Sequence, residues 1–333
     1  MSYQEIRIET NGPASAMAFH ALAPRLPGDD EVAIDVAYSG INFADIQMRL
    51  GLYPDAPKKP FTPGYEVSGI VSAVGKDVHE VKKGDQVAAG TYFGGYASHV
   101  TVPAHQVFKL PANVGLEAGA AMPVNYFTAQ IALFEMARIR KGDRILIEPA
   151  TGGVGVLAIQ MARAVGAEVT GLTTSEHKRG FIEQLGATAM TVREFQADEA
   201  LRGYDLVINS SGGAAIEWQR KRLGITGRII CLGMSSMTTN GKRNYLKIAS
   251  ALLRTPRISI LKLFDVNTGV YALNALRVFR DPIWLEKLTR SLAGADLTNL
   301  KPHIGKVFAA TEVAAAHEFL ETKQATGKVL LHW

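Results

Sequence analysis

The chain has 333 residues, 47% apolar and 20% charged, which is typical of a globular protein long enough for two domains. Its single cysteine, Cys231, excludes an internal disulfide and any zinc site built from several cysteines, and its apolar neighbours suggest a small buried residue. No window approaches the roughly 20 apolar residues of a membrane helix, and MSYQEIRIET does not resemble a signal peptide, so we expect a cytoplasmic protein.

The first 120 or so residues read as short strands separated by glycine and proline. This punctuation predicts a compact, mostly antiparallel β domain. The expected strands are residues 31–40, 66–75, 85–90, 96–103 and 105–111.

From residue 128 onward the pattern changes to strands that alternate with helices. Such alternation predicts βαβ units and a parallel, doubly wound sheet. The expected helices are 128–139, 154–166, 175–187 and 215–224, and the expected strands are 144–150, 167–173, 187–192, 204–212 and 227–233.

Much of the formal net charge of +5 comes from residues 241–262. Apolar residues recur there at helical spacing, so a solvated helix face is favoured over a nucleic-acid surface, and a lipid-facing surface stays open. The segment 311–333 predicts a helix, a turn and a last strand that rejoins the first domain. We therefore expect a catalytic domain from residues 1–122 and 271–333, and a dinucleotide-binding domain from residues 123–270.

The sequence ATGGVG, residues 150–155, lies between a predicted strand and a predicted helix. At Gly152 a side chain would block the approach of a pyrophosphate, and Gly155 lets the helix pack close to the strand. The N–H groups of the first helical turn, at Gly153 and Val154, would then face the phosphates. Because strand, turn and helix follow in the required order, we expect a dinucleotide site.

An NAD site would place an acid at the end of the next strand, where it holds the ribose hydroxyls. Here that strand ends in Thr173, Thr174 and Ser175, followed by Lys178 and Arg179. Hydroxyls and cations receive a 2′-phosphate, which an acid would repel. We therefore expect NADPH as the cofactor, although Lys178 could also be a solvated helix residue.

With INFAD, PGYEVSGIVSAVG and GDQVAAG upstream of this turn, the chain closely resembles the medium-chain dehydrogenases/reductases. The resemblance implies a GroES-like β domain followed by a Rossmann domain. In the zinc-dependent branch, Cys, His and Cys hold the metal at the positions of Asn42, Tyr65 and Asn125. None of these three side chains is a good zinc ligand, so we expect a metal-free protein.

Among zinc-free members the chain is most similar to the quinone oxidoreductases and to related enoyl thioester reductases. It especially resembles the synaptic vesicle membrane protein group. The stretches that carry this likeness are FTPGYEVSGIV, MPVNYFTAQIALFEMA, CLGMSSMTT and FDVNTGVYALNAL.

The resemblance implies hydride transfer from a nicotinamide to a quinone or an electron-poor C=C, with Asn42 and Tyr53 at the site. Asn42 could offer its amide to the nicotinamide carboxamide or ribose, or simply cap the helix of residues 43–50. A phenol stays protonated at neutral pH, so Tyr53 could donate a proton to the acceptor, or it could only pack in its loop.

For the residues near Asn42 and Tyr53 we expect supporting roles. We expect Asp45 to position the turn through backbone hydrogen bonds. We expect Glu66 to be a buried acid paired with an Arg or Lys, and a general-base role is the weaker alternative. Asn125 and Thr128 could face the nicotinamide or simply begin a helix.

Further cofactor contacts come from later in the chain. Asn209 and Gly233 stand at the carboxyl ends of predicted parallel strands, where ligands bind in open α/β sheets. The resemblance also implies weaker cofactor contacts at Asn274 and Lys328, although Lys328 could equally be solvated at a surface turn.

Three functions remain open from the sequence. The first is an NADPH-dependent quinone or enone reductase, and the second is a reductase of enoyl groups on CoA or a carrier protein. The third is a cofactor-binding protein whose main role is peripheral association with a membrane. The family resemblance implies a homodimer, and the sequence does not choose the acceptor.

Overall fold

The computed structural model describes residues 3–237, 245–297 and 299–333. Within this range the chain forms two compact units. The first contains residues 3–127 and 276–333, and the second contains residues 128–237 and 245–275. Each unit is described by itself.

The first unit is built on a mostly antiparallel sheet with the strand order β14-β15-β3-β4-β5-β7, and β6 also pairs with β3. The last strand, β15, joins the sheet of this unit, as expected, and pairs antiparallel with β3 and parallel with β14. The members are β3 (Glu31–Ile41), β4 (Glu66–Val74), β5 (Gln86–Gly90), β6 (His99–Pro103), β7 (Val107–Lys109), β14 (Ile304–Ala309) and β15 (Lys328–His332). A separate antiparallel pair consists of β1 (Tyr3–Ile8) and β2 (Met17–Leu22).

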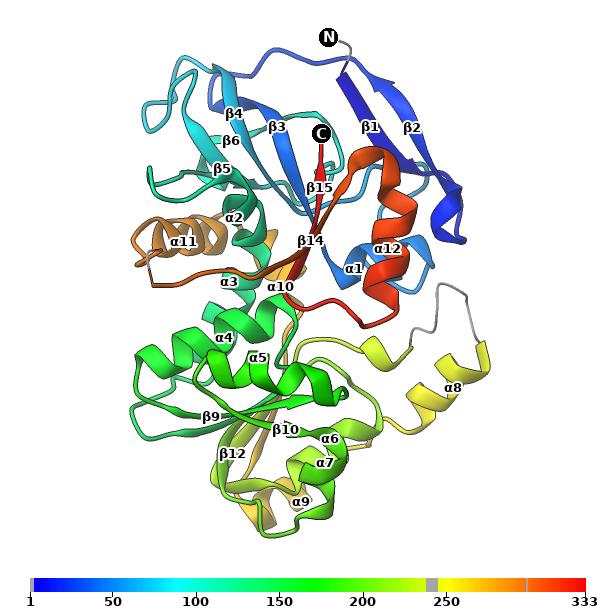
Figure 1. The fold of residues 1–333 in the computed structure, drawn as a ribbon, viewed down its shortest axis with the longest axis vertical. Helices are drawn as coiled ribbons and strands as arrows, with labels where there is room; N and C mark the ends of the chain where they lie inside the picture. Colours follow the sequence, from blue (N-terminus) through cyan, green and yellow to red (C-terminus); the bar gives the residue numbers. More distant parts are fainter. Residues whose placement is uncertain (1–2, 238–244, 298) are drawn as a thin grey trace. The chain divides into compact units, whose positions relative to one another are not determined.

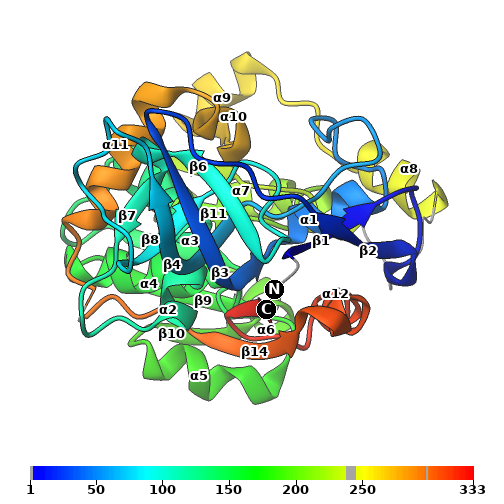
Figure 2. The ribbon, with the colours of Figure 1, turned by 90° about the horizontal axis from the view of Figure 1, so that it is seen from above.

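Two helices from opposite ends of the sequence meet in this unit. The helix α1 (Phe43–Arg49) contacts α12 (Val313–Glu321), and Figure 2 shows them side by side. Their apolar side chains join a core that includes Ile6, Met48 and Val313. The other α-helices of this unit are α2 (Leu116–Ala121), most of α10 (Ala275–Phe279) and α11 (Pro282–Ala293).

The second unit has a wholly parallel sheet with the order β10-β9-β8-β11-β12-β13 (Figure 1). This order reverses between β8 and β11, as in a doubly wound Rossmann fold. The strands are β8 (Arg144–Glu148), β9 (Glu168–Thr173), β10 (Thr188–Thr191), β11 (Tyr204–Asn209), β12 (Leu223–Cys231) and β13 (Gly269–Ala272). The connecting helices include α4 (Gly153–Ala164), α5 (Arg179–Gln184), α6 (Val192–Ala197) and α7 (Ala214–Arg220). The predicted fold class is therefore confirmed.

Some element boundaries differ from the prediction. The helix expected at 128–139 begins earlier, as α3 (Pro123–Gln130), and continues as a π-helical stretch, Ile131–Met136. The helix expected at 175–187 is a 3₁₀ turn, Glu176–Lys178, followed by the short α5. β12 starts at Leu223, because Leu223 already pairs with Tyr204 before a shift of register.

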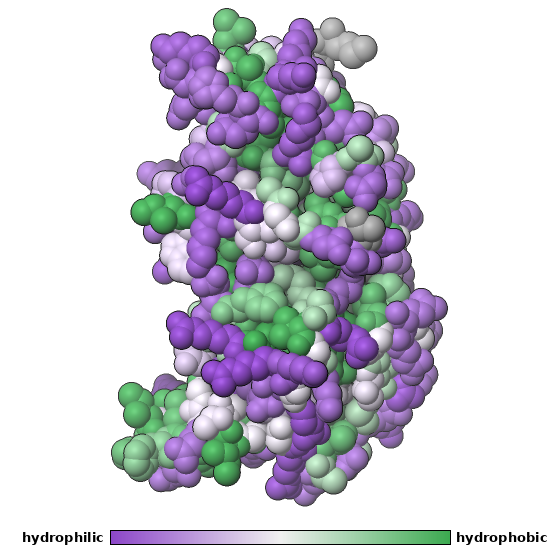
Figure 3. Space-filling model, turned by 90° about the vertical axis from the view of Figure 1, so that its left-hand side faces the viewer, coloured by the Kyte–Doolittle hydropathy of each residue, from purple (hydrophilic) through white to green (hydrophobic). Residues whose placement is uncertain are grey.

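The basic stretch 241–262 exposes its charged residues Arg254, Arg257 and Lys262, as expected of a solvated face, and apolar side chains beside them. Its described part holds α8 (Tyr245–Leu253) and the start of α9 (Ile260–Val266). Residues 241–244 of this stretch lie outside the described part. Apolar side chains on both helices face solvent, with Leu246 85% exposed and Phe264 78% exposed. The face in Figure 3 carries apolar side chains at its lower end, where Figure 1 places α9. Among the described residues, no helix is long and apolar enough to cross a membrane.

Candidate active site

The glycine turn lies between β8 and α4, and Gly152 and Gly155 within it differ in how closely the chain packs around them. A Cβ at Gly155 would lie 2.4 Å from the carbonyl oxygen of Pro149, so the close approach of α4 to the strand requires glycine. A Cβ at Gly152 would meet nothing closer than 3.8 Å, and its φ of −78° suits any residue. The packing of the chain therefore does not itself require glycine at position 152.

The first turn of α4 adds donors at the same place. Gly152 is the N-cap, and the first intrahelical bond at this end runs from Val156 N–H to Gly152 O. The N–H groups of Gly153 and Val154 thus have no partner within the helix. Unpaired N–H groups and the positive end of the helix dipole favour a phosphate. The residues present fit the pyrophosphate of a dinucleotide.

The end of β9 carries hydroxyls and no acid. The Thr173 hydroxyl accepts from the backbone N–H of Ser175 at 3.2 Å, and Thr174 is exposed. Lys178 is only 5% exposed, so it is not the solvated residue that the alternative reading required, and burial lowers its pKa. Arg179 is less available to a 2′-phosphate than expected, because its guanidinium forms ion pairs with Glu176 and Glu194.

At the carboxyl ends of β8 and β11 lies a buried polar network that the sequence did not reveal. The Asn209 amide donates to Gln219 at 2.6 Å, and its carbonyl oxygen accepts from Gly212 N–H at 2.8 Å. Gln219 donates in turn to Glu148, which also accepts from the Ser211 hydroxyl. Both polar ends of Asn209 are thus used inside the protein, and the side chain is fully buried.

The other predicted residues of the second unit differ in exposure. Gly233, after β12, and Asn274, after β13, are both exposed. Thr128 in α3 is buried. Cys231 is half-buried rather than buried, and burial raises the pKa of its thiol to about 11, so the thiol is neutral at pH 7.

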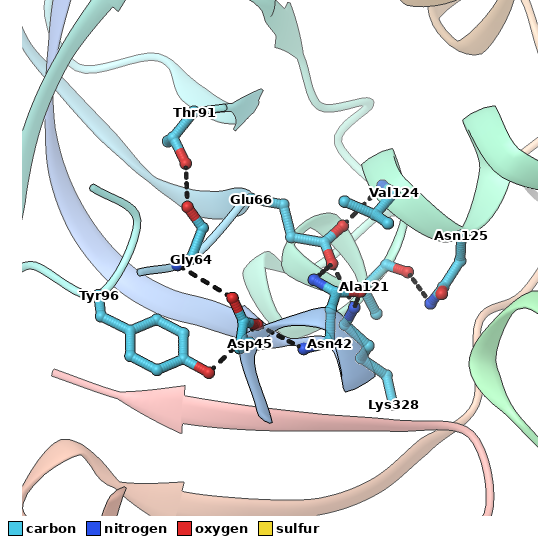
Figure 4. Close-up of polar contacts among 10 residues, drawn as sticks. All are labelled: Asn42, Asp45, Gly64, Glu66, Thr91, Tyr96, Ala121, Val124, Asn125 and Lys328. Carbon is cyan, nitrogen blue, oxygen red and sulfur yellow. Dashed lines mark hydrogen bonds and ion pairs between the residues drawn. The ribbon is translucent and has the colours of Figure 1, made fainter. Parts of the chain in front are cut away.

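In the first unit, Asn42, Glu66 and Lys328 form one cluster (Figure 4). The Lys328 ammonium donates to Asn42 Oδ1 at 2.6 Å and forms an ion pair with Glu66. Asn42 Nδ2 donates to Glu66 Oε1 at 3.1 Å. Lys328 is 3% exposed, so the surface-turn reading of this residue is wrong, whereas the expected pairing of Glu66 with a basic residue is confirmed.

The same glutamate holds the start of α3. Glu66 Oε2 accepts from the backbone N–H of Val124 at 2.8 Å, which satisfies a donor that the helix leaves unpaired. The Asn125 amide donates to the backbone oxygen of Ala121 at 2.9 Å. Part of the hydrogen-bonding capacity of Asn125 is thus spent on the local backbone.

Asp45 serves the turn, as expected, and extends into a buried chain of polar groups. It accepts from the backbone N–H of Asn42 at 2.8 Å, from Gly64 N–H at 3.2 Å and from the Tyr96 hydroxyl at 3.3 Å. The Tyr96 hydroxyl also lies 3.0 Å from His317 Nε2. Burial raises the pKa of Asp45 to about 7 and lowers that of His317 to about 3.

Tyr53 is half-buried in a loop that follows α1. Its ring packs against the core cluster that contains Met48 and Tyr65. Burial, with a contribution from the carboxylates of Asp55 and Asp45, raises the pKa of its phenol to about 12. Asp55 accepts from Arg277 Nε at 3.1 Å, which ties this loop to α10. The phenol therefore stays protonated at neutral pH.

The three positions that correspond to zinc ligands do not suit a metal. Asn42 and Asn125 present amides, and the Tyr65 phenol donates to the sulfur of Met48 at 3.3 Å. Moreover, the Lys328 ammonium already lies against Asn42 and Glu66. In the part of the chain that the structure describes, no group of three or more His, Cys, Asp or Glu could hold a metal ion.

Comparison with known proteins places the chain in a family. The alcohol dehydrogenase GroES-like domain matches residues 28–112, and the zinc-binding dehydrogenase domain matches residues 153–268. The human quinone oxidoreductase is 30% identical over 332 residues, which cover 97% of this chain and 95% of that protein. The chain belongs to the zinc-free quinone oxidoreductase family of medium-chain dehydrogenases/reductases. The human synaptic vesicle membrane protein VAT-1 homolog is 32% identical over 318 residues, 93% of this chain and 80% of that protein.

Solved structures of this family share the fold over the whole chain. The quinone oxidoreductase of Escherichia coli, complexed with NADPH, has a TM-score of 0.85 and 25% identity, covering 99% of this chain and all of that one. The CurK enoyl reductase has a TM-score of 0.83 and 26% identity, covering 100% of this chain and 99% of that one. Both predicted family relationships, to quinone oxidoreductases and to enoyl reductases, are therefore present.

Proposed function

We propose that this protein is an NADPH-dependent reductase that passes a hydride to a quinone or an α,β-unsaturated carbonyl compound without a metal. The observation that carries the proposal is a glycine at position 152 that the packing of the chain does not require, at the start of a helix whose first N–H groups have no partner within the helix. Family membership and the NADPH-bound relative from Escherichia coli support it.

The cofactor contacts follow from the positions of the residues. Gly152, Gly153, Val154 and Gly155 would hold the pyrophosphate. Thr173, Thr174, Ser175 and Lys178 would receive the 2′-phosphate, since the strand ends in hydroxyls, Glu176 is paired with Arg179, and a buried lysine gains from an anionic partner. Asn42, Asn125 and Thr128 would lie toward the nicotinamide, and Gly233 and Asn274 would add outer contacts. The Asn209 side chain would support the site from inside, because its carboxamide already donates to Gln219 and accepts from Gly212 N–H.

When bound, NADPH supplies the hydride, and the reduced acceptor takes up one proton. Tyr53 is the proposed donor to the acceptor's carbonyl oxygen or α-carbon. Its pKa of about 12 keeps the proton on the phenol until charge develops on the acceptor. A well-placed donor of this kind is worth about 10²–10³ in rate.

A second candidate is reduction of enoyl thioesters. The likeness to the CurK enoyl reductase favours it, and the same donor would serve an enoyl thioester equally well. A third candidate is membrane association with little turnover. It draws on the likeness to the VAT-1 homolog and on the exposed leucines of α8.

We further propose that the protein forms a dimer through β13 and α9. β13 is the last strand of the parallel sheet, so its outer edge is open to a second strand among the described residues. Beside it in sequence, α9 exposes Ile260, Leu261 and Phe264, each more than 75%. A second copy would bury this apolar surface and pair the edge.

The deciding experiment is a substrate panel. NADPH oxidation would be followed with naphthoquinones, simple enones and crotonyl-CoA, on protein treated with a chelator and checked for metal content. Turnover with quinones or enones supports the first candidate, and a preference for crotonyl-CoA supports the second. No turnover with any acceptor, together with sedimentation on anionic vesicles, would favour the third. Stoichiometric zinc that is needed for activity would contradict the metal-free proposal.

A further inference from the structure

The Asn42 carboxamide lies between two groups of opposite charge, as Figure 4 shows. Lys328 Nζ donates to its oxygen, and its nitrogen donates to Glu66. An ammonium has only donors, and an ionised carboxylate has only acceptors. The opposite orientation of the amide would place NH₂ against the ammonium and oxygen against the carboxylate. Only one orientation of Asn42 is therefore compatible with its neighbours.

This orientation limits what Asn42 can offer to a ligand. Its oxygen is used by Lys328, and one of its two N–H groups is used by Glu66. The hydrogen bonds of the described residues leave the second N–H, and Asn42 is only half-buried. Asn42 thus keeps one N–H to donate to a ligand, while its oxygen is turned toward the ammonium of Lys328.

The two charged residues that impose this orientation are themselves firmly held. Both are buried, and Glu66 uses its second oxygen for the N–H of Val124. Gly40 leaves the room they need, since a Cβ there would lie 2.7 Å from Glu66 Oε1. The cluster therefore joins β4, β15 and the starts of α1 and α3 in one arrangement.

We propose that Lys328 is a positioning residue that acts through Asn42, rather than a cofactor contact in its own right. It fixes the carboxamide so that the remaining N–H is presented to a carbonyl oxygen. In the proposed reductase, on which this inference rests, that oxygen belongs either to the nicotinamide carboxamide or to the acceptor. Glu66 is the counter-charge that lets the lysine stay buried.

A double-mutant cycle distinguishes action through Asn42 from direct contact. Asn42→Ala and Lys328→Met should each lower kcat/KM by about 10²-fold, the effect of losing one positioned donor. The double variant should lose no more than about threefold beyond Asn42→Ala, because both changes remove the same donor. Losses that multiply would overturn the proposal. A loss confined to NADPH affinity identifies the cofactor as the donor's partner, and a loss confined to kcat identifies the acceptor.

The charge-balanced variant Glu66→Gln/Lys328→Met protects the test against misfolding, since it leaves no unpaired buried charge. It should melt close to the wild type and remain as impaired as Lys328→Met. Recovery of wild-type kcat/KM in this variant would contradict the proposed role of the lysine.

A second readout needs neither cofactor nor turnover. The side-chain amide signals of Asn42 in an NMR spectrum, assigned by their loss in Asn42→Asp, should shift in both variants that lack Lys328. Unchanged signals would overturn the proposal even if the enzyme is active. If the wild type consumes no NADPH but these signals shift, the proposed function fails and the positioning role stands.

Discussion

Gly152 and Gly155 stand three residues apart at the start of α4, but only Gly155 is required by the packing of the chain. A Cβ at Gly155 would lie 2.4 Å from the oxygen of Pro149, whereas one at Gly152 would lie 3.8 Å from its nearest neighbour. This difference separates a structural glycine from a proposed ligand-binding one.

Gly152→Ala should therefore weaken NADPH binding about tenfold or more and leave stability nearly unchanged, because the methyl group would fill only the proposed phosphate space. Gly155→Ala is the matched control and should cost about 1–3 kcal/mol in stability through overpacking. Fluorescence titration and thermal melting measure the two effects. Normal NADPH affinity in Gly152→Ala would contradict the proposed cradle.

Lys178→Ala should raise the Kd for NADPH by about 10- to 100-fold, the value of one charge-assisted hydrogen bond, with little change for NADH. The neighbouring Arg179→Ala is the control, since Arg179 is already paired with Glu176 and Glu194, and we expect a much smaller effect. Equal losses for NADPH and NADH in Lys178→Ala would rule out the 2′-phosphate assignment.

Tyr53→Phe should lower kcat by about 10²–10³ and leave the Kd for NADPH in place, if its phenol is the proton donor. Because its pKa is about 12, activity should show no alkaline decline from this group below about pH 11. Tyr65→Phe removes a phenol that donates to Met48, and its kcat should stay within about threefold of the wild type. Unchanged kcat in Tyr53→Phe would assign that ring to packing alone.

Asp45 should make stability depend on pH in an unusual direction. Its ordinary pKa is 3.8, and burial raises it to about 7 in the folded protein. Between pH 3.8 and about 7 the folded state holds a proton on Asp45 that the unfolded state lacks. The resulting stabilisation of the folded state is therefore complete below pH 3.8 and is lost as the pH rises to about 7. The total is on the order of 4 kcal/mol.

Asp45→Asn should remove this dependence. Urea denaturation at several pH values would show the difference between the two proteins growing by about 1.4 kcal/mol per pH unit across that window. A constant difference would mean that Asp45 is ionised throughout.

Phe264→Asp should convert the proposed dimer to a monomer, because it places a charge in the apolar surface of α9. Leu246→Asp on α8 is the control, since it changes an equally exposed apolar residue away from β13 and should leave the dimer intact. Sedimentation velocity distinguishes the two. A dimer that survives Phe264→Asp would place the interface elsewhere.

The sequence predicted the order of elements well where local signals were strong. Alternating apolar runs with a glycine turn between them gave the parallel sheet, and the hydroxyls that end β9 at Thr173 and follow it could be read directly. The partner of Glu66 could be predicted only by type, because Lys328 lies 262 residues away and periodicity carries no information at that range. For the same reason the link from Asp45 to His317 through Tyr96 left no signal.

Other details depended on contacts with residues far along the chain and could not be predicted. Asn42 begins α1, as its type suggests, but its carboxamide turns to Glu66 and Lys328. In residues 241–262 the exposed cations agree with the expected solvated face, but the extent of apolar exposure on α8 and α9 was not predicted. Helical spacing shows that apolar side chains share one face of a helix, but it does not show whether another element covers that face.

The long separation between Lys328 and its partners also bears on how the protein is made. β15 lies between β14 and β3 in the sheet, and 286 residues separate Lys328 from Asn42. On the ribosome, the whole dinucleotide-binding unit is synthesised before this lysine appears. That unit can fold early, whereas the first unit cannot complete its sheet or pair Glu66 with Lys328 until the last strand has been synthesised. The nascent chain would thus pass through a stage in which the nucleotide-binding unit is folded but the Asn42 carboxamide is not yet held in its final orientation.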